Sequence, residues 1–164
     1  MLEGEVLNMH IAAIHSHLGG YEHIIVHRPG LWSDLEAAIA AISPADGLTR
    51  AYRIFGEVLQ SRGWQSPAYG ACAAQPARHM KERLAVALHY GQPASIALDL
   101  FAQDMAWYAG DIIDAGIEVL PVKRLQDDMP PAIAWYEGEL HNLTRRGRSV
   151  PAVPLVLIGM DRGE

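Results

Sequence analysis

Residues 83–90 read RLAVALHY and are the most informative part of the chain about its architecture. It is an apolar run of strand length that stops at Gly91, which is typical of a strand buried on both faces of a sheet. Residues 112–122, IIDAGIEVLPV, and residues 154–159, PLVLIG, have the same character. Helical patterns separate the three runs. The order predicts an α/β core with some parallel strand pairing.

Three helices are predicted beside these strands, because apolar residues recur there at helical spacing. They cover residues 48–62, residues 93–110 and residues 132–145. Gly63 follows the first as a C-terminal stop, and Pro93 suits the first turn of the second.

The N-terminal part carries three further signals. Residues 10–17, HIAAIHSH, fit either a strand or the end of a short helix, and periodicity leaves both open. Residues 21–27, YEHIIVH, are rich in β-branched residues and predict a strand. Ser33 and Glu36 have the spacing of a capping box and predict that a helix begins there, to end at Pro44.

Size and composition fit one compact domain. The chain has 164 residues, half of them hydrophobic and a fifth charged, and it contains no internal repeat or linker, so residues 1–164 are interpreted as one domain. No apolar run is long enough to span a bilayer, and the N-terminus, MLEGEVLNMH, lacks the pattern of a signal peptide. Cys72 is the single cysteine. We therefore expect a cytoplasmic protein without membrane association.

The formal net charge of −6 argues against a general binder of polyanions. Such binders take much of their affinity from Lys and Arg side chains that neutralise phosphates. A local basic patch remains open, because the field at one face of the molecule decides binding.

Six blocks of sequence cover nearly the whole chain in one order. They are IHSHLGGYEHIIVHRPGLW (14–32), RAYRIFGEVLQSRGW (50–64), RLAVALHYG (83–91), DLFAQDMAWY (99–108), DIIDAGIEVLP (111–121) and IAWYEGELHNLTRRGRSVPAVPLVLIG (133–159). Together they resemble the BglII/BstYI-type restriction endonucleases. The resemblance implies a restriction-endonuclease-like core, in which helices flank a mixed β-sheet.

The resemblance also implies a metal centre, but this sequence has other residue types at the metal-binding positions. The family keeps an Asp at the entry to one strand and a Glu-x-Gln on that strand, where they serve Mg²⁺. Aligned on Arg83 and Gly91, the Asp position falls on Arg78, the Glu position on Ala87 and the Gln position on His89. A cation, a methyl group and an imidazole do not replace two carboxylates around Mg²⁺. We therefore expect no catalytic residues, no Mg²⁺ cofactor and no DNA cleavage.

Arg145, Arg146 and Arg148 form the strongest basic cluster. The resemblance places this neighbourhood near DNA, where Arg side chains contact phosphates or guanine edges. The alternative is a set of cations that complements the C-terminus of a helix, followed by a solvated turn. Both interpretations remain open.

Leu100, Phe101, Met105 and Trp107 make one predicted helix apolar on more than one face. A helix of this kind has to bury both sides. The resemblance implies that the corresponding helices take part in dimerisation, so we expect a homodimer. The alternative is a central helix buried within one protomer.

The chain has eight histidines, and His15, His17, His79 and His89 are candidates for a transition-metal site. No cysteine or carboxylate cluster accompanies them in the sequence, so we predict that they hold no metal.

Three hypotheses follow. The favoured one is a catalytically inactive, pseudo-nuclease member of the family that acts as a structural or protein-interaction subunit, alone as a homodimer or with another protein in a larger complex. The second is an active Mg²⁺-dependent type II site-specific endonuclease whose acids come from elsewhere in the chain. The third is a cleavage-dead DNA-binding protein that reads a site through its arginine cluster.

Overall fold

The computed structural model describes residues 8–66, 78–91, 94–128, 133–147 and 149–163. The elements in these ranges are, in chain order, β1 (Met9–His17), α1 (Gly20–His27), α2 (Pro29–Ala40), α3 (Leu48–Ser61), β2 (Arg78–Lys81), β3 (Leu84–Leu88), α4 (Ala94–Ala109), β4 (Ala115–Pro121), the 3₁₀ helix η1 (Lys123–Asp128), α5 (Tyr136–Thr144) and β5 (Leu155–Arg162). None of the helices in the described part of the chain is long and apolar enough to cross a membrane.

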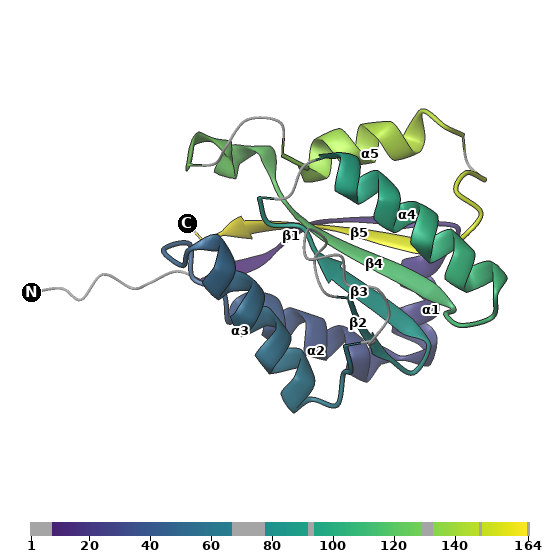
Figure 1. The fold of residues 1–164 in the computed structure, drawn as a ribbon, viewed down its shortest axis with the longest axis horizontal. Helices are drawn as coiled ribbons and strands as arrows, with labels where there is room; N and C mark the ends of the chain where they lie inside the picture. The colour runs from purple at the N-terminus through teal and green to yellow at the C-terminus, as the bar shows by residue number, and fades with distance from the viewer. Residues whose placement is uncertain (1–7, 67–77, 92–93, 129–132, 148, 164) are drawn as a thin grey trace, which may run out of the picture.

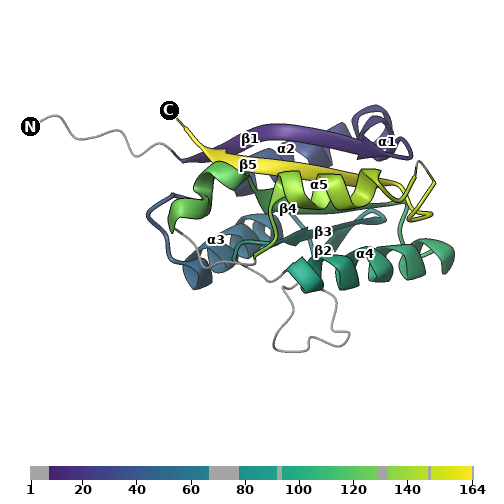
Figure 2. The ribbon, with the colours of Figure 1, turned by 90° about the horizontal axis from the view of Figure 1, so that it is seen from above.

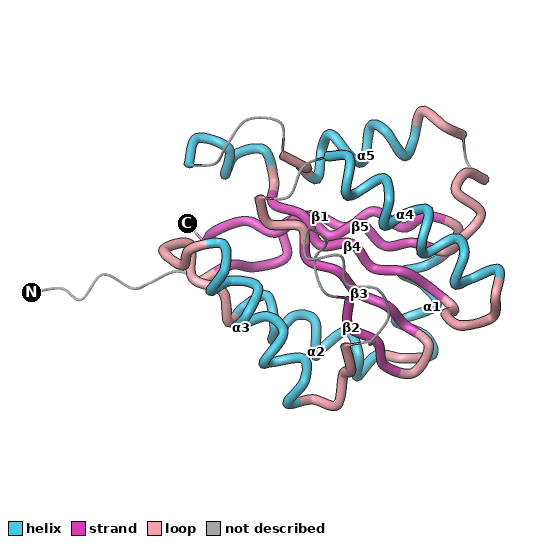
Figure 3. Tube along the Cα trace, viewed as in Figure 1, coloured by secondary structure: helices cyan, strands magenta, loops and turns pink. Residues whose placement is uncertain are grey.

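The strands form one mixed sheet with the order β1-β5-β4-β3-β2 (Figures 1 and 3). The central strands β3, β4 and β5 run parallel, while β1 and β2 pair antiparallel with their neighbours. β1 and β2 therefore lie at opposite edges of the sheet (Figure 2). The mixed sheet flanked by helices, expected from the sequence, is confirmed.

Helices cover both faces of the sheet. α2 and α3 lie on one face, and α4 and α5 lie on the other (Figure 1). Every residue of β3 and β4 is buried, and so are the residues of β5 before its last position. The double covering explains why these three strands read as continuous apolar runs in the sequence instead of alternating.

The predicted strand at residues 21–27 is wrong, because these residues form helix α1. Leu18 and Gly19, both with positive φ, turn the chain out of β1 and directly into the helix. Gly20 and Ile24, one helical turn apart, are its buried positions. The β-branched residues that suggested a strand lie on a helix that is only partly buried, so their intrinsic preference does not decide the local structure.

The predicted start of the second helix is also wrong. α2 begins at Pro29, where the fixed φ of proline and its missing N–H suit the first helical position. Ser33 therefore lies inside the helix, and its spacing to Glu36 is not that of a cap. The open choice for residues 10–17 resolves as the edge strand β1. The other predicted helices and strands occur with ends shifted by a few residues, whereas β2 and η1 were not predicted.

Candidate functional site

Strand register brings three residues into one row across the sheet. Arg78 on β2 pairs with Ala87 on β3, and Ala87 pairs in turn with Glu118 on β4. Paired residues on adjacent strands point to the same face. His89 follows Ala87 by two residues and continues on that face, because side chains alternate along an extended chain. The small side chain of Ala87 leaves room for Arg78 and Glu118 to meet.

Arg78 lies between two carboxylates. One of its terminal nitrogens donates to Oδ1 of Asp104 on α4 and to Oε1 of Glu118 at 3.3 Å. The side chain of Arg78 is 4% exposed, and those of both acids are fully buried. The ring of Trp107 packs against the guanidinium, with its centroid 5.0 Å from Cζ. The cation is therefore enclosed by acids and by an aromatic face, which also attracts it.

His89 extends the network on the other side of Glu118. Its Nε2 donates to Oε2 of Glu118 over 2.5 Å, and both side chains are fully buried. An ionised carboxylate only accepts hydrogen bonds, so Nε2 carries the proton. Nδ1 of His89 is buried and has no hydrogen-bond partner among the described residues. Each oxygen of Glu118 is thus bound by a different partner.

Gly116 makes room for the second acid. A Cβ at this position would lie 2.5 Å from Oδ2 of Asp104 and 2.6 Å from its carboxyl carbon. The carboxylate therefore sits against bare backbone. While Oδ1 binds Arg78, Oδ2 is buried and meets no hydrogen-bond partner in the described part of the chain. A buried carboxylate oxygen of this kind costs stability unless a cation is close.

Burial lowers the pKa of the Arg78 guanidinium from its ordinary value, and attraction to Glu118 opposes this effect. An arginine remains charged in proteins all the same. The cluster is therefore a buried ionic network in which one cation serves two acids. Removing a single partner from such a network leaves an uncompensated charge in a medium of low polarity.

Glu139 on α5 is a third buried acid near the cluster. Burial is the main cause that raises its pKa above the ordinary 4.5, and Glu118 adds to the effect. His89, Asn142 and Arg146 act in the opposite direction. The protonated form is thus favoured in the folded protein more than in the unfolded chain.

The raised pKa of Glu139 predicts a pH-dependent gain from Glu139→Gln. The stabilisation due to a raised folded pKa is complete below pH 4.5 and is lost as the pH rises through the folded value. Since Gln does not titrate, the variant should be more stable than the parent protein at pH 7, and the difference should shrink as the pH falls toward 4.5. Urea denaturation at pH 4 and pH 7 measures the difference. Glu57→Gln on the exposed side of α3 is the matched control, and an equal effect at both pH values would contradict the prediction.

The residues of the basic cluster lie at the end of α5. Arg145 and Arg146 are exposed there, and Arg148 lies outside the described residues. The backbone N–H of Arg145 bonds to the carbonyl of His141, so Arg145 closes the helix. The position agrees with both interpretations of the cluster, as a DNA contact and as a complement to the helix C-terminus.

The apolar residues of α4 point in different directions. Phe101 is buried in the core, Met105 is 41% exposed, and Trp107 is half-buried against Arg78. The side chain of Leu100 lies outside the described residues. Tyr108 and Ile112, exposed by 42% and 48%, follow Met105 at intervals of three and four residues. These three side chains define an apolar stripe, which we call the α4 stripe.

The four candidate histidines are not brought together. His79 faces α3, opposite to Arg78, and its Nδ1 lies 3.2 Å from the hydroxyl of Ser66. Nε2 of His17 donates to the carbonyl of Pro151 at 2.7 Å. Burial lowers the pKa of His15 and of His79. In the described part of the chain, no three His, Cys, Asp or Glu side chains are grouped so that they could hold a metal ion.

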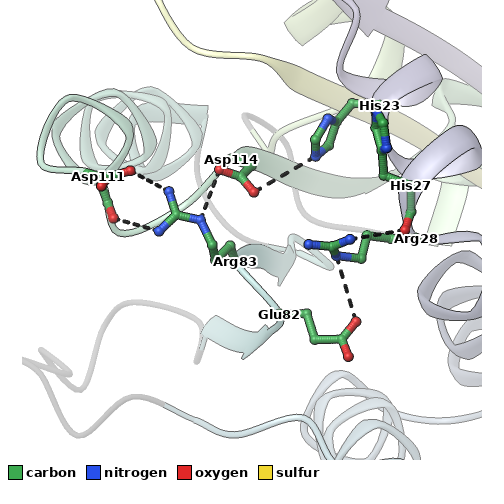
Figure 4. Close-up of polar contacts among 7 residues, drawn as sticks. All are labelled: His23, His27, Arg28, Glu82, Arg83, Asp111 and Asp114. Atoms are coloured by element: carbon green, nitrogen blue, oxygen red, sulfur yellow. Dashed lines mark hydrogen bonds and ion pairs between the residues drawn. The ribbon is translucent and has the colours of Figure 1, made fainter.

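A second polar cluster fixes the tip of the β2–β3 hairpin (Figure 4). Glu82 and Arg83 both have positive φ, which is unfavourable for residues with a side chain. Arg83 binds Asp111 at 2.5 Å and Asp114 at 2.9 Å. His23 on α1 lies 3.9 Å from Asp114. These contacts hold the strained turn in place.

The same hairpin tip borders a cleft of about 790 Å³ between β2 and the start of α2. Arg28 approaches Glu82 there at 3.7 Å (Figure 4). Lys81 approaches Asp34 at 3.6 Å. The cations of this cleft are thus matched by acids. It lies at the other end of β3 from His89, and so apart from the buried cluster.

Three of the acids in the buried cluster were missed by sequence reasoning: Asp104, Glu118 and Glu139. The position of Glu118 could have been recognised from the sequence. Glu118 is the single charged residue in the apolar run IIDAGIEVLPV after Asp114, and a charged residue in a buried strand requires a partner. Asp104 and Glu139 lie on helices, where one acid among several is unremarkable.

Comparison with known proteins agrees with the fold. The family described as restriction endonuclease BglII/BglIII matches residues 12–160. Among solved structures, the crystal structure of free BglII superposes with a TM-score of 0.65. The match covers 90% of this chain and 77% of that one, at 14% sequence identity, so it concerns the fold alone. No curated protein sequence matches the chain.

Proposed function

Since this chain belongs to the BglII/BglIII family of restriction endonucleases, we propose that it is a catalytically inactive member that acts as a structural or protein-interaction subunit. The observation that carries the proposal is the buried guanidinium of Arg78 between Asp104 and Glu118. Arg78 and the neighbouring Ala87 are the positions at which the resemblance places the family's two acids.

The residues at these positions do not fit a divalent metal. Mg²⁺ takes hard oxygen ligands in octahedral geometry. Arg78 offers a positive charge and Ala87 offers a methyl group. His89 offers a nitrogen that already donates to Glu118. The acids that are present, Asp104 and Glu118, have Arg78 between them.

A second candidate is an active nuclease with relocated acids. It is favoured by the register, which places the carboxylate of Glu118 directly beside Ala87 on the next strand. The acid would then come from β4 in place of β3. This candidate requires that Arg78 leave its position, because its guanidinium occupies the space between the carboxylates.

Incubation with plasmid DNA and Mg²⁺ or Mn²⁺ separates the two candidates. The inactive member should leave supercoiled plasmid intact at every protein concentration. Site-specific cutting that Glu118→Gln abolishes would establish the relocated centre. A salt-dependent shift of duplex DNA without cutting, lost on replacing Arg145, Arg146 and Arg148 by Ala, would instead support the cleavage-dead DNA-binding protein.

The α4 stripe supports the proposal that this protein binds a partner chain. Met105, Tyr108 and Ile112 expose apolar surface along one side of α4 and the turn after it. Met105 and Tyr108 are one helical turn apart and so lie next to each other, and exposed apolar patches mark interaction surfaces. Because α4 also holds Asp104 and Trp107 in the buried cluster, the stripe lies on a rigid element. We propose that a second copy of the chain covers it.

Glu substitutions at Met105 and Tyr108 should weaken the homodimer. A charge at the centre of an apolar interface has no partner there, so the dimer dissociation constant should rise at least about tenfold, which corresponds to 1.4 kcal/mol. Sedimentation equilibrium over a range of concentrations measures it. Val26→Glu, at a 70% exposed position on α1, is the matched control. A monomeric parent protein would exclude the homodimer and direct the search to a different partner, for which co-purification from native lysate is the test.

A further inference from the structure

We propose that two copies of the chain pair through the outer edges of their β1 strands. The strands run antiparallel about a two-fold axis between Ala12 and Ala13, so that one sheet continues across the dimer. This surface is separate from the α4 stripe, because β1 lies at the edge of the sheet and α4 covers one of its faces (Figures 1 and 2). The inference goes beyond the proposed function and does not depend on whether the chain cuts DNA.

The two edges of the sheet differ in how open they are to another strand. β2, at one edge, has four residues and ends on Lys81. β1, at the other edge, has nine residues and contains no proline, lysine, arginine or acid. Short strands and charged side chains protect an edge, whose outward N–H and C=O groups otherwise pair with another chain. Among the described residues no strand pairs with the outer side of β1, so this edge can accept one.

The sequence of β1 is complementary to itself. Residues 10–15 read HIAAIH, which is the same in both directions. When two such segments run antiparallel about their centre, Ile11 of each copy lies opposite Ile14 of the other. His10 lies opposite His15 in the same way. An interface about a two-fold axis needs a match of this kind, because every contact in it occurs twice. The edge of β1 therefore fits a second copy of the same strand.

A β-bulge in β1 brings this match into register. The pairing with β5 shifts after Ile11, and Ala12 is the extra residue. Ile11 then pairs with Met160 and Ile14 with Ile158, so both isoleucines point to the same face of the sheet. Without the bulge they would point to opposite faces and could not meet across the axis. A bulge disturbs the pairing of an edge, but here both copies have it beside the axis and the register is kept.

The isoleucines border a groove that the second strand would cover. The groove has a volume of about 580 Å³ and lies between β1 and α2. Ile14 is 40% exposed on its wall. The other apolar residues of the lining are Met9, Ile11, Trp32, Ala37 and Ala40. Pairing of two β1 strands places the isoleucines of each copy beside the groove of the other, and the burial of apolar surface favours association.

The test is sedimentation equilibrium at pH 8, where histidine side chains are largely neutral. It uses chains that carry Met105→Glu and Tyr108→Glu, in which the α4 stripe is blocked, so that association reports the β1 edge. The blocked chains should still form dimers. Adding Ile14→Glu should raise their dissociation constant at least about tenfold, because the charge would face an isoleucine of the other copy. Adding Val26→Glu, at a 70% exposed position on α1, is the matched control and should leave the dissociation constant unchanged.

Mixing two variants of the blocked chain tests the register. Ile11→Lys and Ile14→Glu should each associate weakly alone, since a charge then faces an isoleucine at both symmetric positions. Mixed in equal amounts, the two variants should bind each other at least about tenfold more tightly than either binds itself. The new lysine then lies opposite the new glutamate, while the second pair of positions keeps both isoleucines.

Several outcomes would overturn the proposal. Blocked chains that stay monomeric at every concentration have no pairing edge. An unchanged dissociation constant for Ile14→Glu would place the contact elsewhere on the surface, and a mixture that binds no more tightly than its components would exclude this register. The other proposals fail in different ways. An active nuclease shows plasmid cleavage, and an α4 stripe without a partner shows equal association of parent and blocked chains.

Discussion

Arg78→Met is expected to lower the free energy of unfolding by about 3 to 5 kcal/mol. Methionine matches the length of the arginine stem and fills most of its space, so the loss reports the charge and not a cavity. Without the guanidinium, the buried carboxylates of Asp104 and Glu118 face each other with no cation between them. Breaking a buried ionic network at the cation that two acids share is among the most damaging kinds of single substitution.

Chemical denaturation at neutral pH measures this loss. Combining Arg78→Met with Asp104→Asn and Glu118→Gln should recover much of it, because the acids then need no counter-charge. Arg62→Met is the matched surface change. Its pair with Asp34, at 3.3 Å, is solvated on the arginine side, so it should cost at most about 1 kcal/mol. If Arg78→Met and Arg62→Met lowered the free energy of unfolding equally, burial of the cluster would make no difference to its contribution to stability.

Gly20→Ala is expected to destabilise the protein by about 3 kcal/mol, at the upper end of the range for overpacking. A Cβ on Gly20 would lie 2.6 Å from the carbonyl oxygen of Leu155 and 2.9 Å from its nitrogen. These atoms belong to the backbone of β5 and cannot rotate away. Helix α1 would have to move off the sheet to accept the methyl group.

Gly30→Ala provides the matched control for Gly20→Ala. Gly30 also lies in the first turn of a helix, but a Cβ there meets none of the described atoms within 4 Å. Alanine should therefore stabilise α2 slightly, by about 0.5 to 1 kcal/mol, because it lowers the entropy of the unfolded chain. Opposite signs for the two substitutions in urea denaturation would locate the effect in the contact between α1 and β5. A neutral Gly20→Ala would mean that α1 does not approach β5 this closely.

Much of the sheet could be predicted from the sequence, because its central strands are buried on both faces. The runs at residues 83–90, 112–122 and 154–159 admit few alternatives at their length and composition. The N-terminal part was harder to predict. Residues 21–27 form a helix despite their β-branched side chains, since the turn at Leu18 and Gly19 and the proline at the start of α2 set the local structure.

The buried cluster could be predicted only in part. Sequence alone singled out Arg78, Ala87 and His89, but it gave no partner for Arg78. That partner depends on the register between β3 and β4, which pairs Ala87 with Glu118 across 31 residues of chain. The approach of α4, which brings Asp104 to Gly116, is likewise a tertiary effect. Patterns in a single sequence indicate which residues are buried. They do not indicate which buried residues are in contact with one another.

The row formed by Arg78, Ala87 and Glu118 also bears on how such a protein changes over generations. Ala87→Glu alone would crowd a new carboxylate against Glu118 under one guanidinium. Arg78→Asp alone would leave a third buried acid and no cation. Each single step toward a metal centre therefore lowers the stability of the fold before any activity could favour it. Two acids could therefore enter this row only if both positions changed together, because each single change leaves a buried carboxylate without sufficient counter-charge.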